Sequence, residues 1–287
     1  MSQQVMKAKK IAIEELKEWP DNQIRKWVVE RKIDGFRYTR LKGKWLSKQG
    51  KRFFNVREIQ KELDNCRRLN GYIIDGELAG KTWQQTMTLF RSSKADVSQG
   101  IADGKFWIFD IVDPNMLHEP WIDRNQRLME TVLRIQHPNI AVVPSHSLLS
   151  FDGFEQRHND HLAMGCDGSI LKSRYGGYEF KRSKLWLKVK PIHEVDCKIV
   201  GFKEGKGKYR GTLGSLLVRV PIPKHKWSNH VTGVSGMTDE DRHYIWKNQD
   251  KLLNTIVEVK YRTISEKDRL VEGRIHRLRP DKTCTEK

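Results

Sequence analysis

The sequence changes character at Pro191. Before this residue, patterns typical of helices and strands alternate, whereas after it short strand patterns follow one another around a single helix. These two patterns bury their apolar faces in different ways. A chain of 287 residues is also long enough for one large core or two modest ones. The sequence therefore predicts an α+β domain over residues 1–191 and a smaller β-rich domain over residues 192–287.

Apolar periodicity places the individual elements. Helices are predicted where apolar residues recur at helical spacing, over residues 11–19, 56–69, 82–91, 121–135, 154–164 and 238–248. Strands are predicted where β-branched and aromatic residues gather, over residues 26–31, 36–41, 44–48, 72–78, 106–112, 140–143, 169–172, 186–189, 195–202, 214–220, 227–234, 255–262 and 273–278. Thr238 is the expected N-cap of the last helix, with Asp241 three residues later. Four or five short strands with one helix after Pro191 are typical of a small β-barrel such as an OB-fold.

The chain is strongly basic, with 54 lysines and arginines against 36 acidic residues and a formal net charge of +18. A charge of this size favours a polyanionic partner, and nucleic acid is the commonest one. The basic residues are spread along the chain, so we expect the positive surface to belong to folded domains.

The four cysteines lie far apart, at Cys66, Cys166, Cys197 and Cys284. This spacing excludes a local zinc ribbon or CxxC redox motif, and free thiols are expected. No apolar run reaches membrane length, and residues 1–10 lack the apolar core of a signal peptide. We therefore predict a soluble monomer with no membrane partner.

Lys32 is the first candidate for chemistry. Val28 and Val29 place it at the end of a predicted strand, and Asp34-Gly35 marks a turn before the next strand. A lysine in this position can be a nucleophile when its surroundings favour the neutral amine. The alternative is an ordinary lysine at the tip of a solvated hairpin, and this stretch alone does not separate the two.

Five further clusters complete a set of six: Asp75-Gly76-Glu77-Leu78, Phe106-x-x-Phe109-Asp110, Asp167-Gly168 followed by Lys172, Trp186 to Pro191 with Lys188 and Lys190, and Arg279-x-Asp281-Lys282. Alone, each has an ordinary structural explanation as a turn, a core residue, a solvated strand face or a basic tail. Together they supply what nucleotidyl transfer needs. These parts are a nitrogen nucleophile, cations for phosphate charge, carboxylates for Mg²⁺ and an aromatic surface for a base.

In this order and spacing, the six clusters resemble the motifs of the covalent nucleotidyltransferase superfamily. This superfamily comprises ATP-dependent DNA ligases, mRNA capping enzymes and RNA ligases. The resemblance spans nearly the whole chain and is greatest to the small two-domain ATP-dependent DNA ligases of bacteriophages and viruses. It implies a nucleotidyltransferase (ATP-grasp-like) adenylylation domain over residues 1–191 and an OB-fold domain over residues 192–287.

The resemblance also implies an activity and a location. It implies an enzyme that uses ATP and Mg²⁺ to seal nicks in duplex DNA through a lysyl-AMP intermediate, with roles in DNA repair, replication and recombination. The expected location is the cytoplasm, or the host-cell cytoplasm if the protein is viral. Nicked double-stranded DNA is the expected partner.

Residue by residue, the resemblance implies specific roles. Lys32 bonds to AMP, Lys188 and Lys190 hold the α-phosphate, and Glu77 and Asp167 place the metal. The other implied nucleotide contacts are the ribose ligands Arg37 and Glu77, the adenine-stacking Phe106, Lys172, and the pyrophosphate ligands Arg279, Asp281 and Lys282.

Two positions depart from the family pattern. The fourth motif usually has glutamate where this chain has Asp167, whose shorter side chain can bind metal through water. The strand after the first motif usually has Ser-Arg where this chain has Ser47-Lys48. Lysine cannot copy the bidentate contact of arginine with the 5′-phosphate of a nick. We therefore expect Lys48 or Arg52 to bind that phosphate.

Two alternatives remain. An RNA ligase or a capping guanylyltransferase of the same superfamily is disfavoured by Asp34, which RNA ligases commonly lack, and by the DNA-ligase form of the Trp186 cluster. A non-catalytic, basic OB-type nucleic-acid-binding protein would explain the charge and the barrel. It would not explain why the six clusters occur together.

Overall fold

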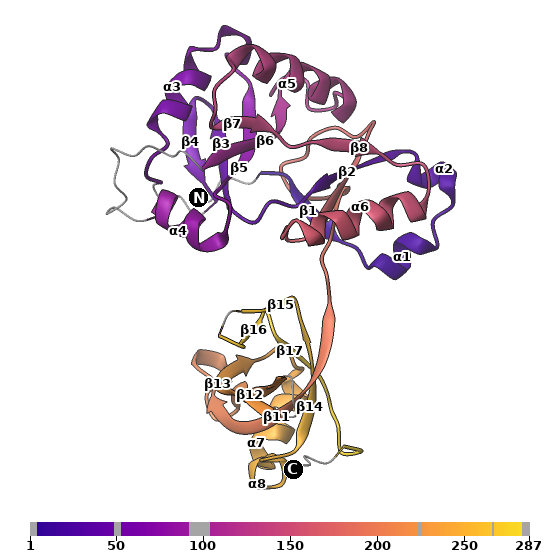
Figure 1. The fold of residues 1–287 in the computed structure, drawn as a ribbon, viewed down its shortest axis with the longest axis vertical. Coiled ribbons are helices and arrows are strands. Elements are labelled where there is room, and N and C mark those ends of the chain that lie inside the picture. Colours follow the sequence, from indigo (N-terminus) through magenta and orange to yellow (C-terminus); the bar gives the residue numbers. More distant parts are fainter. Residues whose placement is uncertain (1–4, 49–52, 92–103, 223–225, 266, 283–287) are drawn as a thin grey trace. The chain divides into compact units, whose positions relative to one another are not determined.

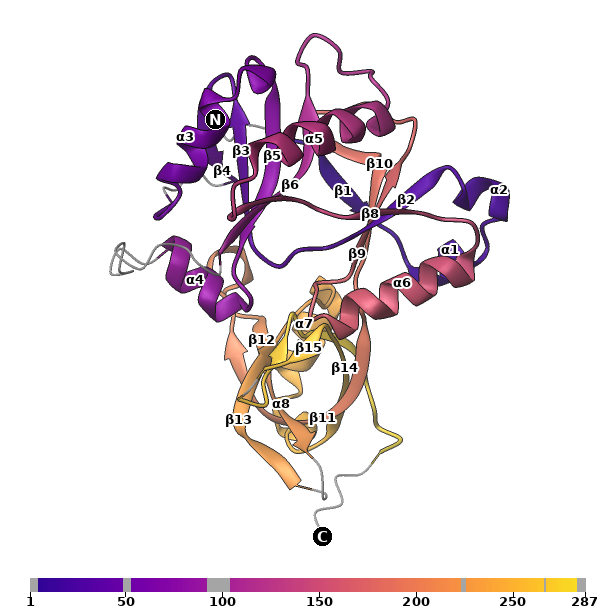
Figure 2. The same ribbon diagram turned by 45° about the horizontal axis from the view of Figure 1, so that its top comes forward.

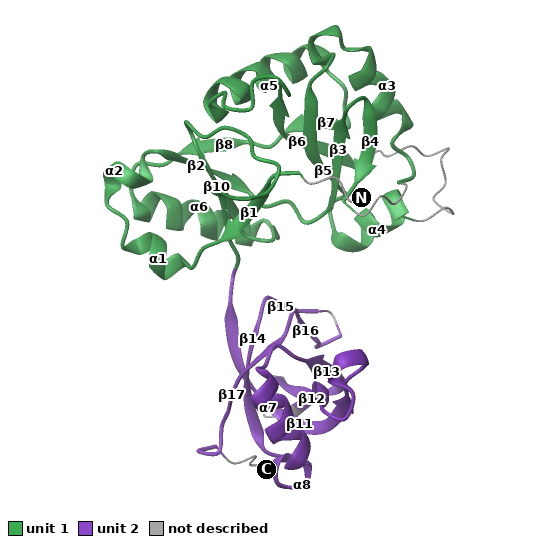
Figure 3. Ribbon diagram, turned by 180° about the vertical axis from the view of Figure 1, so that it is seen from behind, with its two compact units in different colours: residues 1–190 green, residues 191–287 purple. Residues whose placement is uncertain are grey.

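The chain forms two compact units in a computed structural model, Met1–Lys190 and Pro191–Lys287 (Figure 3). The structure describes residues 5–48, 53–91, 104–222, 226–265 and 267–282. Among these residues, no helix combines the length and apolar character needed to cross a membrane.

The elements of the first unit are shown in Figure 1. Its helices are α1 (Ile13–Lys17), α2 (Asp21–Ile24), α3 (Arg57–Asn65), α4 (Trp83–Arg91), α5 (Trp121–Ile135) and α6 (Phe151–Ala163), with a 3₁₀ turn at Arg67–Leu69. Its strands are β1 (Lys7–Lys10), β2 (Trp27–Arg31), β3 (Phe36–Leu41), β4 (Lys44–Ser47), β5 (Ile73–Ala79), β6 (Lys105–Val112), β7 (Ile140–Val142), β8 (Ser145–Ser147), β9 (Ser169–Ser173) and β10 (Arg182–Val189).

The strands of the first unit make two five-stranded sheets. The first, called here the β2 sheet, has the order β1-β10-β9-β2-β8, and the second, the β5 sheet, has the order β4-β3-β5-β6-β7. The edge pairs β1–β10 and β6–β7 are parallel, and the other pairs are antiparallel. Helix α5 lies along the β5 sheet, and α6 lies along the β2 sheet (Figure 1 and Figure 2).

The segment around Lys32 connects these two sheets. Strand β2 ends at Arg31 in one sheet, and β3 begins at Phe36 in the other. The prediction that Lys32 lies at the end of a strand is confirmed, and the hairpin-tip alternative is wrong. A residue between two sheets can be surrounded by side chains from both, unlike a residue at the tip of a hairpin.

Three apolar clusters hold the first unit together. One lies under α3 and α5 on the β5 sheet and includes Ile59, Leu63 and Leu128. A second lies between α6 and the β2 sheet and includes Phe154 and Val29. The third joins the sheets, because it combines side chains of β3, β5, β6 and β10, namely Leu41, Ile73, Val112 and Trp186.

The second unit is built on an antiparallel sheet of order β13-β12-β11-β14-β17. Its elements are β11 (His193–Glu204), a 3₁₀ turn at Gly207–Tyr209, β12 (Leu213–Ile222), β13 (Lys226–Val234), α7 (Asp239–Lys247), α8 (Gln249–Leu252), β14 (Ile256–Tyr261), β15 (Thr263–Ile264), β16 (Leu270–Val271) and β17 (Arg274–Leu278). The edge strands meet in one parallel bridge, between Ser235 and Arg274. Continuous pairing that would close a barrel is absent from the described residues, so the closed form of the predicted barrel is not observed.

Most predicted elements occur, with instructive differences. The helix predicted over residues 11–19 begins only at Ile13, because the Ile11 N–H donates to the Lys188 carbonyl and continues the pairing of β1 with β10. The helix predicted over residues 56–69 ends at Asn65, since Cys66 has an extended backbone. The short strands β1, β8, β15 and β16 were not predicted. Helix α7 begins after Thr238 with the expected capping box, in which Thr238 and Asp241 bond to each other's backbone N–H.

Candidate active site

A cavity of about 410 Å³ in the first unit is lined by residues of both sheets. The charged residues on its wall are predominantly basic, with Glu30 and Glu77 as the acidic ones. The basic residues on it are Lys7, Arg31, Lys32, Arg37, Lys48, Arg91, Lys172, Arg182 and Lys188. Such a wall favours an anionic ligand, because clustered cations in a partly desolvated site attract negative charge.

The turn before β9 fixes the backbone of Lys32. The Lys32 N–H donates to the Gly168 carbonyl at 2.9 Å, and the Asp167 N–H donates to the Lys32 carbonyl at 3.0 Å. Gly168 has a φ of +104°, and a Cβ at this position would lie 2.1 Å from the Val189 carbonyl oxygen. The close approach of β10 to this turn therefore requires glycine, and it brings Lys190 to the same place as Lys32.

The Lys32 amine lies in a cluster of lysines around one buried carboxylate. Lys32 Nζ donates to Asp167 Oδ2, and Lys190 Nζ lies 3.1 Å from the same oxygen. Burial, and after it the nearby charges of Arg182 and Lys190, lower the pKa of Lys188. The structure thus brings together four of the predicted site residues: Lys32, Asp167, Lys188 and Lys190.

Arg37 and Glu77 are neighbours across the β3–β5 pair. Arg37 is held by the buried Asp75, with Nε 2.7 Å from Oδ1 and Nη2 bonded to Oδ2. Burial alone would lower the pKa of Arg37, but the Asp75 carboxylate more than offsets this effect and raises it. Burial raises the pKa of Glu77 to about 7, against the opposing charges of Lys32 and Arg37.

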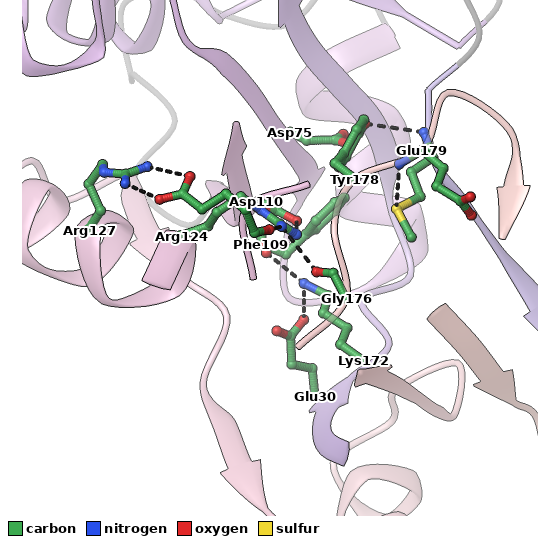
Figure 4. Close-up of polar contacts among 12 residues, drawn as sticks. Glu30, Asp75, Phe109, Asp110, Arg124, Arg127, Lys172, Gly176, Tyr178 and Glu179 are labelled. Atoms are coloured by element: carbon green, nitrogen blue, oxygen red, sulfur yellow. Dashed lines mark hydrogen bonds and ion pairs between the residues drawn. The ribbon is translucent and has the colours of Figure 1, made fainter. Parts of the chain in front are cut away.

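Glu30 and Lys172 form a second charged pair on the cavity wall (Figure 4). Lys172 Nζ lies 2.9 Å from Glu30 Oε2 and donates to the Phe109 carbonyl at 2.6 Å. Glu30 is only 2% exposed, and burial raises its pKa to about 7 although Lys172 opposes the shift. Its other oxygen, Oε1, has no hydrogen-bond partner among the described residues. A buried acceptor without a partner is costly, so this oxygen is suited to a donor group of a ligand.

The position of Phe106 does not fit its predicted role as the stacking surface for adenine. Its ring is fully buried in the core of the β5 sheet, where it packs edge-on against Tyr38 and Trp45, so it does not line the cavity. Phe109, three residues later, does line the cavity, and the Arg37 guanidinium lies 5.1 Å from its ring centroid. The stacking role predicted for Phe106 is therefore wrong in position, because Phe106 and Phe109 face opposite sides of β6.

The comparisons with known proteins agree with this geometry. The family model described as "ATP dependent DNA ligase domain" matches residues 5–190, which are nearly the whole first unit. The chain belongs to the ATP-dependent DNA ligase domain family.

Individual relatives are distant. The chain is 27% identical over 201 residues to a "DNA ligase" of Haemophilus influenzae, covering 66% of this chain and 67% of that protein. It is 28% identical over 148 residues to a "Probable DNA ligase" of Aquifex aeolicus, covering 47% of this chain and 25% of that protein. The chain thus spans only a quarter of the Aquifex protein's length.

The fold has a solved counterpart over almost its full length. A structure described as "DNA binding with a minimal scaffold: Structure-function analysis of Lig E DNA ligases" superposes with a TM-score of 0.74 at 19% identity. The match covers 97% of this chain and 100% of that chain. It establishes a mixed α+β fold similar to that of the DNA ligases.

The remaining predicted residues of this ligase-family chain fall into two groups. Lys48 lines the cavity of the first unit, whereas Arg52 lies outside the described residues. Arg279, Asp281 and Lys282 belong to the second unit, where Arg279 Nη2 lies 2.8 Å from Asp281 and Lys282 pairs with Asp196. Their predicted role at the nucleotide stays a prediction.

Several residues on the cavity wall were missed from the sequence. Glu30 carried a usable signal, since a glutamate directly after Val28 and Val29 is unusual in a buried strand. Phe109 had the same signal as Phe106, and only the facing of β6 separates the two. Lys7 and Arg182 had no signal in the sequence, because their position on the cavity wall depends on the unpredicted pairing of β1 with β10.

Proposed function

We propose that the protein is an ATP-dependent DNA ligase that seals nicks in duplex DNA through a lysyl-AMP intermediate. One observation carries the proposal. The Lys32 amine lines a basic cavity and shares the buried Asp167 carboxylate with Lys190, in a unit that belongs to the ATP-dependent DNA ligase domain family.

Lys32 is the nucleophile in the first step. Its neutral amine attacks the α-phosphorus of ATP, a P–N bond forms, the P–O bond to pyrophosphate breaks, and the amine loses a proton to solvent. Asp167 orients Nζ by accepting its hydrogen bond, and Lys188 and Lys190 neutralise the charge that develops on the α-phosphate. The AMP then passes to the 5′-phosphate of the nick, and the 3′-hydroxyl displaces it to complete the phosphodiester.

Adenine fits the part of the cavity wall formed by Glu30, Lys172 and Phe109. The Phe109 ring offers a stacking surface, and Glu30 Oε1 offers an acceptor for the exocyclic amine. Lys172 holds Glu30 in place through the other carboxylate oxygen. Arg37 and Glu77, which are adjacent on the same wall, are assigned to the ribose.

The carboxylates of Glu77 and Asp167 fit a divalent cation, because oxygen donors are the ligands that Mg²⁺ prefers. Both interact electrostatically with Lys32, Glu77 from the cavity wall and Asp167 through its ion pair with the lysine, so they lie near the proposed position of the phosphates. A bound Mg²⁺ would supply additional positive charge at the phosphates.

We assign the second unit, residues 191–287, as an OB-type domain that contacts DNA. The five-stranded antiparallel sheet and the Ser235–Arg274 bridge between its edge strands support this assignment. The net charge of the whole chain, +18, supports binding to DNA through phosphates more than through base edges. We keep the pyrophosphate role for Arg279, Asp281 and Lys282, and the 5′-phosphate role for Lys48 or Arg52.

The test is covalent labelling. The full chain is incubated with Mg²⁺ and ATP labelled on the α-phosphate, and the products are separated on a denaturing gel. Label should stay on the protein with ATP and not with GTP. Label from GTP alone would indicate a capping guanylyltransferase, and no label from either nucleotide would refute the proposal.

Lys32→Ala isolates the nucleophile. This variant should lose covalent labelling yet still seal a nick whose 5′-phosphate already carries AMP, because Lys32 is the nucleophile only in the first step. Lys26→Ala, at an exposed lysine outside the cavity, is the matched control and should behave as wild type in both assays. Equal loss of both activities in Lys32→Ala would point to a structural role for the lysine.

A further inference from the structure

Asp75 is a buried carboxylate whose two oxygens are both fully occupied. Oδ1 accepts hydrogen bonds from Arg37 Nε at 2.7 Å and Thr39 Oγ1 at 3.0 Å. Oδ2 accepts from Arg37 Nη2 and from the Tyr178 hydroxyl at 2.6 Å. A carboxylate with four donors has little rotational freedom, so the arginine bound to it is also fixed.

Tyr178 reaches Asp75 from a distant part of the chain. It lies in the loop between β9 and β10, and its side chain lies against Asp75 in Figure 4. Its ring packs edge-on against Phe180 and Trp186, and its hydroxyl also accepts from the Met6 N–H at 3.2 Å. Burial raises the pKa of Tyr178, so the hydroxyl stays protonated and can donate to Asp75.

Because Asp75 is held in place, Arg37 is held in place too, and Arg37 lines the cavity of the first unit. Asp75 uses the edge of the guanidinium formed by Nε and Nη2. The remaining nitrogen, Nη1, has no hydrogen-bond partner among the described residues. The direction in which Nη1 points is therefore set by Asp75, and the direction of Asp75 is set by Tyr178 and Thr39.

We propose that Tyr178 is a positioning residue for nucleotide recognition, whose hydroxyl holds Asp75 and thereby aims Nη1 of Arg37 at the sugar of the nucleotide. This inference rests on the proposed function, because it takes Arg37 to contact ATP. The orientation of Arg37 can nevertheless be measured without any activity.

Tyr178→Phe is the first test, because it keeps the packed ring and removes only the hydroxyl. The rate of lysyl-AMP formation is measured against ATP concentration. We expect the KM for ATP to rise roughly three- to tenfold, which matches the typical net contribution of one hydrogen bond. The rate at saturating ATP should change by less than about twofold, because the Lys32 cluster is untouched. Tyr175→Phe removes the same hydroxyl from a tyrosine that is 66% exposed, and it should change neither quantity.

A double-mutant cycle separates positioning from a general structural effect. In an Arg37→Lys background, Tyr178→Phe should raise the KM no further, because the group that the hydroxyl aims has gone. Thr39→Val removes the other fixed donor to Asp75 and should raise the KM in the same direction, which keeps the test open if Tyr178→Phe folds poorly. An unchanged KM in both variants, or an equal effect of Tyr178→Phe in both backgrounds, would overturn the inference.

A spectroscopic measurement keeps this inference separate from the proposed function. The Arg37 Nε–H resonance, assigned by its loss in Arg37→Lys, should shift in Tyr178→Phe and not in Tyr175→Phe. If the wild-type protein forms no lysyl-AMP but the resonance shifts, the proposed function fails and the positioning by Tyr178 stands. If labelling succeeds and the resonance does not move, the positioning role fails alone.

Discussion

One methyl group at Gly168 should disable the Lys32 site. With a φ of +104°, a Cβ at this position would lie 2.1 Å from the Val189 carbonyl oxygen. Gly165, three residues earlier, has a φ of +76° and no heavy atom within 4 Å of its Cβ position. Gly165→Ala therefore measures backbone strain alone, whereas Gly168→Ala measures strain together with a collision against β10.

The expected magnitudes follow from these two positions. A left-handed backbone costs a non-glycine residue about 1–2 kcal/mol, so Gly165→Ala should lower the free energy of unfolding by that amount. In Gly168→Ala the turn has to move away from Val189. That movement breaks the two backbone hydrogen bonds between Lys32 and residues 167–168, which contribute about 1 kcal/mol each. We therefore expect a total loss of roughly 3–4 kcal/mol, about 2 kcal/mol more than in the control.

Two assays check this reasoning. Urea unfolding of the full chain, followed by tryptophan fluorescence, gives the difference in stability between the two variants. Labelling with ATP at a temperature where both are folded gives the effect on the site. We expect the rate of labelling to fall at least about tenfold in Gly168→Ala, because Lys32 and Lys190 no longer share the Asp167 carboxylate. Equal stability and equal labelling of the two variants would refute the reasoning.

Three further outcomes are expected. Asp167→Glu should keep covalent labelling and Asp167→Ala should lose it, as measured on the same gel, and an active alanine variant would make Asp167 a turn residue only. Affinity for nicked DNA should fall by orders of magnitude between about 50 and 200 mM salt in a binding titration. An affinity that does not change with salt would contradict binding through the DNA phosphates. Because burial raises the pKa of Glu30 from 4.5 to about 7, the folded state binds the extra proton, and stability should fall as pH rises through this window. The fall is on the order of 3 kcal/mol, and in urea unfolding it should be smaller in Glu30→Gln than in a Glu58→Gln control.

The local elements of the fold could be predicted because they depend on neighbouring residues. The capping box at Thr238 needs only a side chain three residues away, and the apolar run of β6 is visible in the sequence itself. The short strands β1 and β8 could not be predicted. A strand of three or four residues has almost no periodicity, and it exists because a partner strand from another part of the chain lies beside it.

The reactive groups of the proposed site can be proposed from the sequence, whereas the residues that hold them in place cannot. Lys32, Lys188 and Lys190 could be identified because their residue types and spacing are constrained by chemistry. The sequence does not separate Phe106 from Phe109, because the two differ only in the side of β6 that they face. A strand alternates its faces, but which face meets a cavity depends on the layer packed against it.

The sequence by itself determined the division at Pro191, the order of the main elements, the basic charge and the lysine that we propose as nucleophile. These follow from composition, periodicity and motif spacing, which are properties of the chain before it folds. Only the tertiary structure decided that the segment after β2 connects two sheets, that Glu30 Oε1 is left without a partner, and that Tyr178 holds Asp75. The physical reason is distance along the chain. The Tyr178–Asp75 hydrogen bond joins residues 103 positions apart, and a contact of this kind exists only after both sheets have packed together.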